Sequence, residues 1–291
     1  MPWRLTAASA ALSAVLRQFQ PDIVHAHMMT GAVLGKMFRP WFKYRMVTTA
    51  HNEFPRSVIL MRVGDRVIAT SAASASALVR RGIPKDKIRV VHNGVLDTPR
   101  LDQLSSGSAP SLRQPAIVTV AGLYWRKGIA DLIEAFDAVS RRNLHAHMYI
   151  VGDGPQRHEF QAQARQCFGH SRIHFAGFVP DPRSYYQQAD IFVLASHQET
   201  FGLVITEARQ AGCAVVATNV GGIPEALDGG EAGILVPPYR SDLLGSALIR
   251  LIEAPAELER LRRKARQNLE VFTVKRASAQ TMDVYRELTT A

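Results

Sequence analysis

Residues 191–212 constrain the fold of this chain more than any other stretch. The apolar run over 191–195 has the composition of a strand that is buried on both faces of a parallel sheet. A turn with Gly202 follows, and residues 203–211 have helix-forming composition up to Gly212, where a helix commonly ends. The stretch therefore predicts a strand, a turn and a helix.

Two glutamates stand at fixed places in this predicted unit. Glu199 falls on the turn and Glu207 falls inside the helix. The first N–H groups of the helix and its dipole suit a phosphate group, and Gly202 lets the backbone approach a ligand closely. The alternative is an ordinary strand, turn and helix with two solvated glutamates.

The same alternation of strand and helix recurs along the chain, and it predicts an α/β fold with parallel sheets. A loop over 122–128 and a helix over 129–140 show the pattern well. The other predicted strands are residues 21–27, 45–51, 65–71, 90–95, 116–121, 147–152, 173–179, 214–218 and 233–237.

Proline, serine and glycine gather between residues 98 and 115, which is typical of a linker. A length of 291 residues is sufficient for two domains. The predicted division is a first domain over 1–100, a linker over 101–115, a second domain over 116–275 and a C-terminal helix over 276–291 that packs back on the first domain.

The composition excludes several classes of protein. Apolar residues make up 47% and charged residues 21%, as in ordinary globular proteins. Cys167 and Cys213 are the two cysteines, which fits a reducing compartment and forms no zinc-ligand pattern. No apolar run approaches the ~20 residues of a membrane span, and residues 1–18 predict an amphipathic helix. We expect a cytoplasmic protein.

The positive charge is concentrated in the first part of the chain. Residues 1–100 contain 15 Lys and Arg against 5 Asp and Glu, whereas residues 101–291 contain 20 of each kind. This surplus favours an anionic partner, which would be membrane lipid, a phosphorylated acceptor or nucleic acid. A solvated basic face is the alternative, and nucleic acid has no support beyond charge.

Cations and aromatic residues interleave at Arg39, Trp41, Phe42, Lys43 and Arg45. Such a mixture suits the interface of a membrane, where aromatic rings lie at headgroup level and cations meet anionic lipid. We therefore expect peripheral contact with the inner face of the membrane. The alternative is that Trp41 and Phe42 are core residues beside solvated cations.

Lys127 follows a predicted strand, so it lies at the carboxyl edge of a sheet, where ligands of open α/β sheets bind. A lysine there can balance the charge of a diphosphate. The sequence has no Asp-x-Asp pair of the kind that holds a divalent ion on a diphosphate, so we expect no metal and no cofactor. His25 and His27 share one strand face, but the sequence offers no third metal ligand.

Glu199 and Glu207, with Phe-Gly-Leu-Val between them, resemble the E-x7-E signature of retaining GT-B glycosyltransferases, in particular glycosyltransferase family 4. The resemblance covers about 270 residues, and further segments match the family in the right order: 21–27, the strand that ends at His51, 126–128, 177–179 and 221–225. It implies a GT-B fold, with two Rossmann-like doubly wound parallel-sheet domains that face each other across a cleft. The family's first strand and glycine-rich loop have no counterpart, so the N-terminal domain is expected to be incomplete.

The resemblance also implies roles for residues. Glu199 would bind a hydroxyl of the donor sugar, Glu207 would bind the ribose hydroxyls, and Lys127 would meet the diphosphate. His51 would face the donor sugar, so His51 and Glu199 occupy the catalytic positions. The backbone that would hold phosphate belongs to Phe201, Gly202, Leu203 and Val204.

Five further residues complete the expected donor site. The arginine of the family pattern falls on Gly122, which is a departure, and Arg126 is expected to replace it. Gly154, Phe178 and Val179 match family segments beside the nucleotide. A lone Gly-x-Gly at Gly152 and Gly154 is weak support for a dinucleotide cofactor.

The predicted function is transfer of a sugar from a nucleotide-sugar donor to a glycan, lipid-linked or other acceptor, with retention of anomeric configuration and without metal. The first alternative is a non-catalytic nucleotide-sugar binder, because the glycine-rich loop is missing. The second is a sugar-nucleotide epimerase of GT-B architecture, which would need no acceptor. The sequence identifies neither the donor nor the acceptor.

Overall fold

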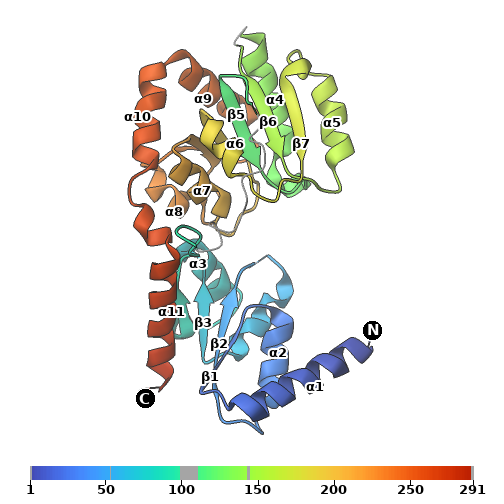
Figure 1. Cartoon of the computed structure of the whole chain (residues 1–291), viewed down its shortest axis with the longest axis vertical. Helices are drawn as coiled ribbons and strands as arrows, with labels where there is room; N and C mark the ends of the chain where they lie inside the picture. Colours follow the sequence, from blue (N-terminus) through green and yellow to red (C-terminus); the bar gives the residue numbers. More distant parts are fainter. Residues whose placement is uncertain (1, 53, 99–110, 143–144, 290–291) are drawn as a thin grey trace. The chain divides into compact units, whose positions relative to one another are not determined.

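The computed structural model describes residues 2–52, 54–98, 111–142 and 145–289 of the chain (Figure 1). The chain folds into two compact units. Unit 1 consists of Met1–Asn93 and Lys275–Ala291, and unit 2 consists of Gly94–Val274. The last helix of the sequence therefore belongs to the same unit as the first strands.

In the described part of unit 1, four parallel strands lie in chain order. They are β1 (Ile23–Ala26), β2 (Arg45–Ala50), β3 (Arg66–Ala69) and β4 (Ile88–Val90). The helical elements of unit 1 are α1 (Pro2–Phe19), α2 (Met29–Phe38), η1 (Arg56–Val63), α3 (Ala72–Arg80), η2 (Lys85–Lys87) and α11 (Val274–Thr289).

Helices cover both faces of this sheet. Successive side chains of a strand point to opposite faces, so alternate residues of β2 are buried against different helices. Met46 of β2 packs in one apolar cluster with residues of α2, η1 and α3. Its neighbour Val47 packs in another cluster with Val284 and Leu288 of α11. Figure 1 shows α11, the red helix, beside β3 of the same unit.

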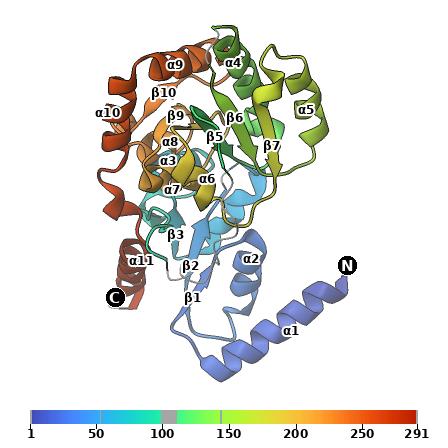
Figure 2. The same ribbon diagram turned by 45° about the horizontal axis from the view of Figure 1, so that its top comes forward.

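The described residues of unit 2 form a sheet of six parallel strands in the order β10–β9–β8–β5–β6–β7. These are β5 (Ala116–Val120), β6 (His147–Val151), β7 (Ile173–Gly177), β8 (Ile191–Leu194), β9 (Ala214–Thr218) and β10 (Ile234–Val236). Figure 2 shows β10 and β7 at opposite edges of this sheet. The order is that of a doubly wound fold, whose direction of winding reverses between β5 and β8.

Alternate residues of β8 enter the two cores of unit 2. Ile191 and Val193 pack on the face covered by α4, α5, α9 and α10, and Phe192 and Leu194 pack on the face covered by α6, α7, α8 and η7. Burial of each such side chain contributes about 1.5–3 kcal/mol to stability.

The helical elements among the described residues of unit 2 are η4 (Trp125–Lys127), α4 (Ile129–Arg141), α5 (Arg157–Arg165), η5 (His170–Arg172), α6 (Arg183–Gln188), α7 (Leu203–Ala211), α8 (Ile223–Ala226), η6 (Asp228–Gly230), α9 (Ser241–Glu253), α10 (Pro255–Ala265) and η7 (Leu269–Phe272).

The α/β class and the parallel sheets are confirmed, and the predicted fourth strand is present, but its predicted bounds of 90–95 are wrong. Strand β4 ends at Val90. The following segment leaves the sheet, and the N–H groups of Val95 and Leu96 both donate to the Phe272 carbonyl oxygen at 3.0 and 3.1 Å. Residues 101–110 of the predicted linker lie outside the described residues, and Leu112 near its end is buried in a core of unit 2.

Candidate active site

The loops that follow β5 and β8 are joined, because these strands are neighbours in the sheet of unit 2. Ile117 of β5 pairs with Ile191 of β8. The His197 N–H donates to the Arg126 carbonyl oxygen at 2.8 Å, and His197 Nε2 lies 2.8 Å from the Asp131 carboxylate. Both contacts hold the two segments together where the winding of the sheet reverses, the place at which open α/β sheets bind ligands.

Lys127 and Glu199 form an ion pair at this point. The distance from Lys127 Nζ to Glu199 Oε2 is 2.5 Å, and the side chains are only 17% and 15% exposed. The Ser196 hydroxyl lies 3.4 Å from the same carboxylate oxygen and donates to it. Both charged residues were predicted at this edge, but their contact was not predicted. A diphosphate that approaches Lys127 would compete with Glu199 for the ammonium group.

The turn before α7 presents backbone N–H groups. Gly202 adopts φ +89°, a left-handed conformation that L-residues disfavour. The first hydrogen bond of the helix runs from the Ile205 N–H to the Gly202 carbonyl oxygen at 2.9 Å, so the N–H groups of Leu203 and Val204 lie ahead of the helical ladder. Together with the helix dipole, these groups can bind a phosphate group.

Phe201 anchors this turn through its side chain. The side chain is 2% exposed, and its ring centroid lies 5.6 Å from that of Phe272 in an edge-on contact. On the other side, Gly221 adopts φ +53°, and a Cβ atom at Gly221 would overlap the Glu199 carbonyl oxygen. The 221–225 turn therefore packs directly on the loop that carries Glu199, and only glycine permits this approach.

Glu207 lies inside α7, as predicted, and lines a pocket of about 360 Å³ within unit 2. The Tyr186 hydroxyl donates to Glu207 Oε2 at 2.9 Å. Burial raises the pKa of the Glu207 carboxyl; the Tyr186 hydrogen bond opposes this rise, and the nearby Asp181 adds to it. The remaining carboxylate oxygen can accept hydrogen bonds from a ligand in this pocket.

Gly122 and Gly154 lie on the loops after β5 and β6, and the backbones of these loops are hydrogen-bonded. The Leu123 N–H donates to the Asp153 carbonyl oxygen at 3.0 Å, and the Gln156 N–H donates to the Leu123 carbonyl oxygen at 3.2 Å. The two glycines are thus brought to the same edge of the sheet as Lys127.

Arg126, Phe178 and Val179 contact none of the charged pair's side chains through a described hydrogen bond or ion pair. The Arg126 guanidinium carbon lies 5.5 Å from the Tyr124 ring centroid. Phe178 is 74% exposed and follows β7, two strands away from β5, which corresponds to roughly 10 Å. These residues share the edge of the sheet, and their donor-binding roles stay predictions.

His51 belongs to unit 1 and directly follows β2. His27 Nδ1 lies 3.0 Å from His51 Nε2. Burial lowers the pKa of His51, and the neighbouring His27 lowers it further. Both histidines line a small pocket of about 110 Å³ with Met28, Met29 and Met61. His51 therefore lies in a recess at the carboxyl end of its strand, where burial and His27 disfavour protonation of its ring.

The His25 side chain does not point to a metal site. Its Nδ1 lies 2.7 Å from the Tyr285 hydroxyl and its Nε2 lies 2.7 Å from the Thr49 hydroxyl, so both ring nitrogens have protein partners. Among the residues that the structure describes, no group of three or more His, Cys, Asp or Glu residues could hold a metal ion.

Three partners in this site were not predicted from the sequence: Tyr186, Asp131 and His197. Each acts through a residue far away in the chain, and no motif marks it. Tyr186 would have been a candidate only if the packing of α6 on α7 had been known.

Comparisons with known proteins agree with this geometry. The family model "Glycosyl transferases group 1" matches residues 103–268, and the model "Glycosyltransferase Family 4" matches residues 1–97. The two units with parallel sheets define a GT-B glycosyltransferase fold. The chain belongs to the glycosyl transferases group 1 family.

Relatives and solved structures extend over most of the chain. A glycogen synthase of Mycobacterium tuberculosis is 29% identical, over 92% of this chain and 71% of the relative. A D-inositol 3-phosphate glycosyltransferase of Saccharomonospora viridis is 28% identical, over 91% and 70%. The structure of Anabaena HepE in complex with UDP has a TM-score of 0.80 at 21% identity, over 97% of this chain and 82% of HepE.

Proposed function

We propose that this protein transfers a sugar from a nucleotide-sugar donor to an acceptor, with retention of anomeric configuration and without a metal ion. The observation that carries the proposal is the Lys127–Glu199 pair at the reversal point of the sheet, beside the N-terminus of α7. A phosphate-binding helix start, a cation and a carboxylate lie together there, which is what a sugar diphosphate requires.

Each group has a defined task in this reaction. Lys127 and the N–H groups of Leu203 and Val204 stabilise the charge that develops on the leaving diphosphate. Glu199 accepts a hydrogen bond from a sugar hydroxyl, and Glu207 accepts hydrogen bonds from the ribose hydroxyls. The acceptor oxygen attacks from the face that the diphosphate leaves, and a phosphate oxygen takes its proton, so no side chain serves as a nucleophile.

Relatives support the donor class. HepE has been solved with UDP and with UDP-glucose, and a relative is named for transfer to D-inositol 3-phosphate. We extend the donor class, a nucleotide sugar, to this chain. The acceptor in this proposal is a glycan or a lipid-linked acceptor, with phosphorylated polyols as a further class to test.

The test uses the full chain with UDP-, GDP- and ADP-sugars and a panel of acceptors. A transferase releases the nucleoside diphosphate only when an acceptor is present, and nuclear magnetic resonance of the product reports whether the anomeric configuration is retained. Conversion of a donor without acceptor would indicate an epimerase. Calorimetric binding of a donor without turnover on any acceptor would indicate a non-catalytic binder. An inverted product would overturn retention alone.

We also propose peripheral contact of unit 1 with an anionic membrane surface. Trp41 is 74% exposed, which contradicts the alternative that it is a core residue, and Phe42 beside it is half-buried. Lys43 and Arg45 are exposed next to these rings. No helix among the described residues is long and apolar enough to cross a membrane. Sedimentation with anionic and neutral vesicles tests the contact. The protein is expected to sediment with the anionic vesicles at low salt and to be released at high salt.

A further inference from the structure

Unit 1 contains a second recess, at the end of its sheet opposite to His51. Its lining includes Asp22, directly before β1, and Arg45, the first residue of β2. His51 follows the other end of β2, six residues along an extended strand, which corresponds to roughly 20 Å. The recess is therefore distinct from the His51 pocket.

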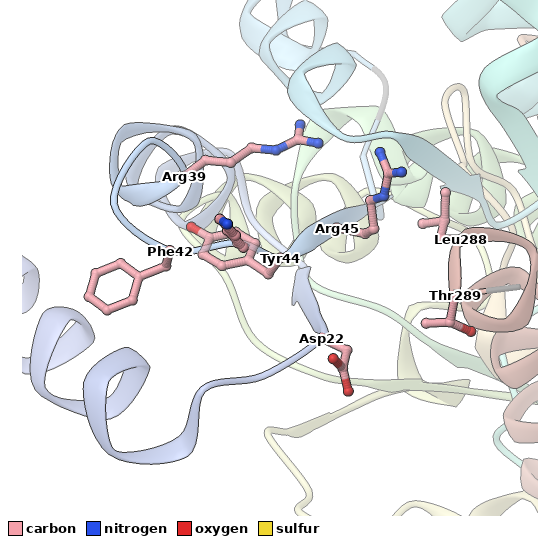
Figure 3. Close-up of a pocket in the computed structure, with 8 residues that line it drawn as sticks. Asp22, Arg39, Phe42, Tyr44, Arg45, Leu288 and Thr289 are labelled. Carbon is pink, nitrogen blue, oxygen red and sulfur yellow. The ribbon is translucent and has the colours of Figure 1, made fainter. Parts of the chain in front are cut away.

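Cations dominate this recess, which we call the amino-edge pocket. It is lined by Asp22, Arg39, Phe42, Lys43, Tyr44, Arg45, Leu288 and Thr289 (Figure 3). Three of these side chains are cationic and one is a carboxylate. Figure 3 shows the Arg39 and Arg45 guanidinium groups on one side, with the Asp22 carboxylate pointing away from them.

Asp65 fixes the Arg39 guanidinium. Arg39 Nη2 donates to both carboxylate oxygens of Asp65 at 2.8 and 2.9 Å, and the Met46 N–H donates to Asp65 at 2.8 Å. Burial alone would raise the pKa of the Asp65 carboxyl, but these hydrogen bonds and the charges of Arg39 and Arg45 outweigh it and lower the pKa. Asp65 is thus ionised, and Arg39 keeps its other N–H donors for a ligand in a fixed direction.

Asp65 balances about one of the three cations, and the exposed Lys43 and Arg45 side chains remain available. Among the described residues, no carboxylate lies within ion-pair distance of Lys43 or Arg45. Two arginines with a lysine are a combination that recognises phosphate, because guanidinium groups donate in pairs to phosphate oxygens. Carboxylates are recognised by the same groups but offer fewer acceptor oxygens.

The size of the amino-edge pocket limits the ligand. Its volume is about 590 Å³, which exceeds that of a single phosphate ion and lies in the usual range for small organic ligands. The Tyr44 hydroxyl is hydrogen-bonded to the Gly35 carbonyl oxygen, so its ring is fixed in the lining. The pocket can hold a phosphate group together with its organic substituent.

We propose that the amino-edge pocket binds a phosphomonoester, either a soluble one or the headgroup of an anionic lipid. This proposal does not depend on the donor site. Its lipid form rests on the membrane contact proposed above and names the chemical group that unit 1 would recognise on the membrane. Exposed Trp41, which follows Arg39 by two residues, favours the lipid headgroup as the source.

The soluble arm of the test is a titration with glycerol 1-phosphate, followed by nuclear magnetic resonance. The variant is Lys43→Gln with Arg45→Gln, which removes two exposed cations from the pocket. The matched control is Arg80→Gln with Lys85→Gln, which removes two exposed cations of unit 1 outside the lining. We expect the pocket variant to bind at least about tenfold more weakly and the control to stay near the wild type. Lys127→Ala must leave this binding unchanged, because it alters only the candidate donor site.

The lipid arm compares vesicles that carry phosphatidate with vesicles that carry oleate at the same surface charge. A preference for phosphatidate that the pocket variant loses and the control keeps supports a headgroup site. Binding of glycerol 1-phosphate without vesicle binding supports the pocket and rejects the membrane contact. The proposal is overturned if two results are obtained together. The first is equal binding to both kinds of vesicle, weakened to the same extent in the pocket variant and the control. The second is no binding of glycerol 1-phosphate. The proposal is also overturned if Lys127→Ala loses glycerol 1-phosphate binding while the pocket variant keeps it.

Discussion

The Lys127 ammonium group lies 2.5 Å from the Glu199 carboxylate, although 72 residues separate them in the chain. The pair joins the loop after β5 to the loop after β8 across the reversal point of the unit 2 sheet. Before a donor binds, the cation proposed for the diphosphate and the carboxylate proposed for the sugar therefore satisfy each other. Donor binding has to replace this contact with two new ones.

Lys127→Ala is expected to weaken binding of a nucleoside diphosphate by ~1.5–3 kcal/mol, because a charged hydrogen bond to phosphate is lost. Isothermal titration calorimetry with UDP, GDP and ADP measures the change. Lys264→Ala is the matched control, because Lys264 is also paired with a glutamate, Glu231 at 2.8 Å, on an exposed surface. Unchanged affinity in Lys127→Ala for every diphosphate would contradict the assignment of Lys127.

Glu199→Gln should have the opposite effect on nucleoside diphosphates. An amide carries no charge to hold the ammonium group, so Lys127 becomes available, and affinity should rise by ~0.5–1 kcal/mol while sugar transfer falls. The readouts are calorimetry and turnover of the same preparations, with Glu231→Gln as the control. A loss of diphosphate affinity in Glu199→Gln would show that the ion pair positions Lys127 instead of competing with the ligand.

Glu207→Ala should abolish discrimination between ribose and 2′-deoxyribose. The wild type is expected to prefer the ribonucleoside diphosphate by ~1.5–3 kcal/mol, because the carboxylate accepts hydrogen bonds from the ribose hydroxyls. Gln210→Ala, which alters another residue of the same pocket, should keep the preference. If the wild type binds both nucleotides equally, Glu207 does not recognise ribose.

Removal of divalent metal should leave donor binding and transfer intact. Lys127 and the start of α7 are expected to balance the diphosphate charge, and the chain has no Asp-x-Asp pair. Activity and calorimetry before and after dialysis against EDTA provide the measurement. Loss of either, with recovery on addition of magnesium or manganese, would overturn the metal-free mechanism.

The stability of unit 1 should fall when the pH drops from about 6.5 to about 4. Burial, together with the neighbouring His27 and His51, lowers the pKa of His25 to about 4, whereas a histidine in an unfolded chain titrates near 6.5. Between pH 6.5 and pH 4, His25 is protonated in the unfolded chain but stays unprotonated in the folded protein. Protonation therefore favours the unfolded state as the pH falls. Above pH 6.5 this group contributes no pH dependence.

The expected loss across this window is roughly 2 kcal/mol, after allowance for the partial exposure of the ring. Urea unfolding of β2, followed by pulsed hydrogen–deuterium exchange at a fixed labelling pH, measures it. His25→Gln should flatten the dependence, and His158→Gln on an exposed position of unit 2 should not. An equal slope in the wild type and His25→Gln would assign the pH dependence to other groups.

Local patterns predicted what depends on neighbours in sequence. The apolar run 191–195 and the Gly212 stop predicted β8 and α7, with Glu199 on the turn and Glu207 in the helix, because burial and helix termination are local. The strand near Val90 was predicted to continue to Val95. Its backbone instead bonds to Phe272, and a contact of such sequence separation leaves no trace in local composition.

The contacts of the candidate site depended on strand order in the same way. Lys127 was correctly predicted at the carboxyl edge of the sheet. Its contact with Glu199 also requires β8 to lie next to β5, although β6 and β7 come between these strands in the chain. Tyr186 likewise reaches Glu207 only through the packing of α6 on α7. The residue types at the site were predictable, and their partners were not.

The position of α11 in unit 1 determines the order in which the two units can complete their folding during synthesis. A ribosome completes β1 to β4 early, but Val284, Leu288 and Tyr285, which cover one face of that sheet and hold His25, emerge only after all of Gly94–Val274 has been synthesised. Unit 2 is continuous in sequence and can fold first, although it is the later unit to begin. A nascent chain stalled before Lys275 should therefore contain a protease-resistant unit 2 and a protease-sensitive β2. The strands β1 to β4 are therefore among the last elements of this chain to reach their final packing.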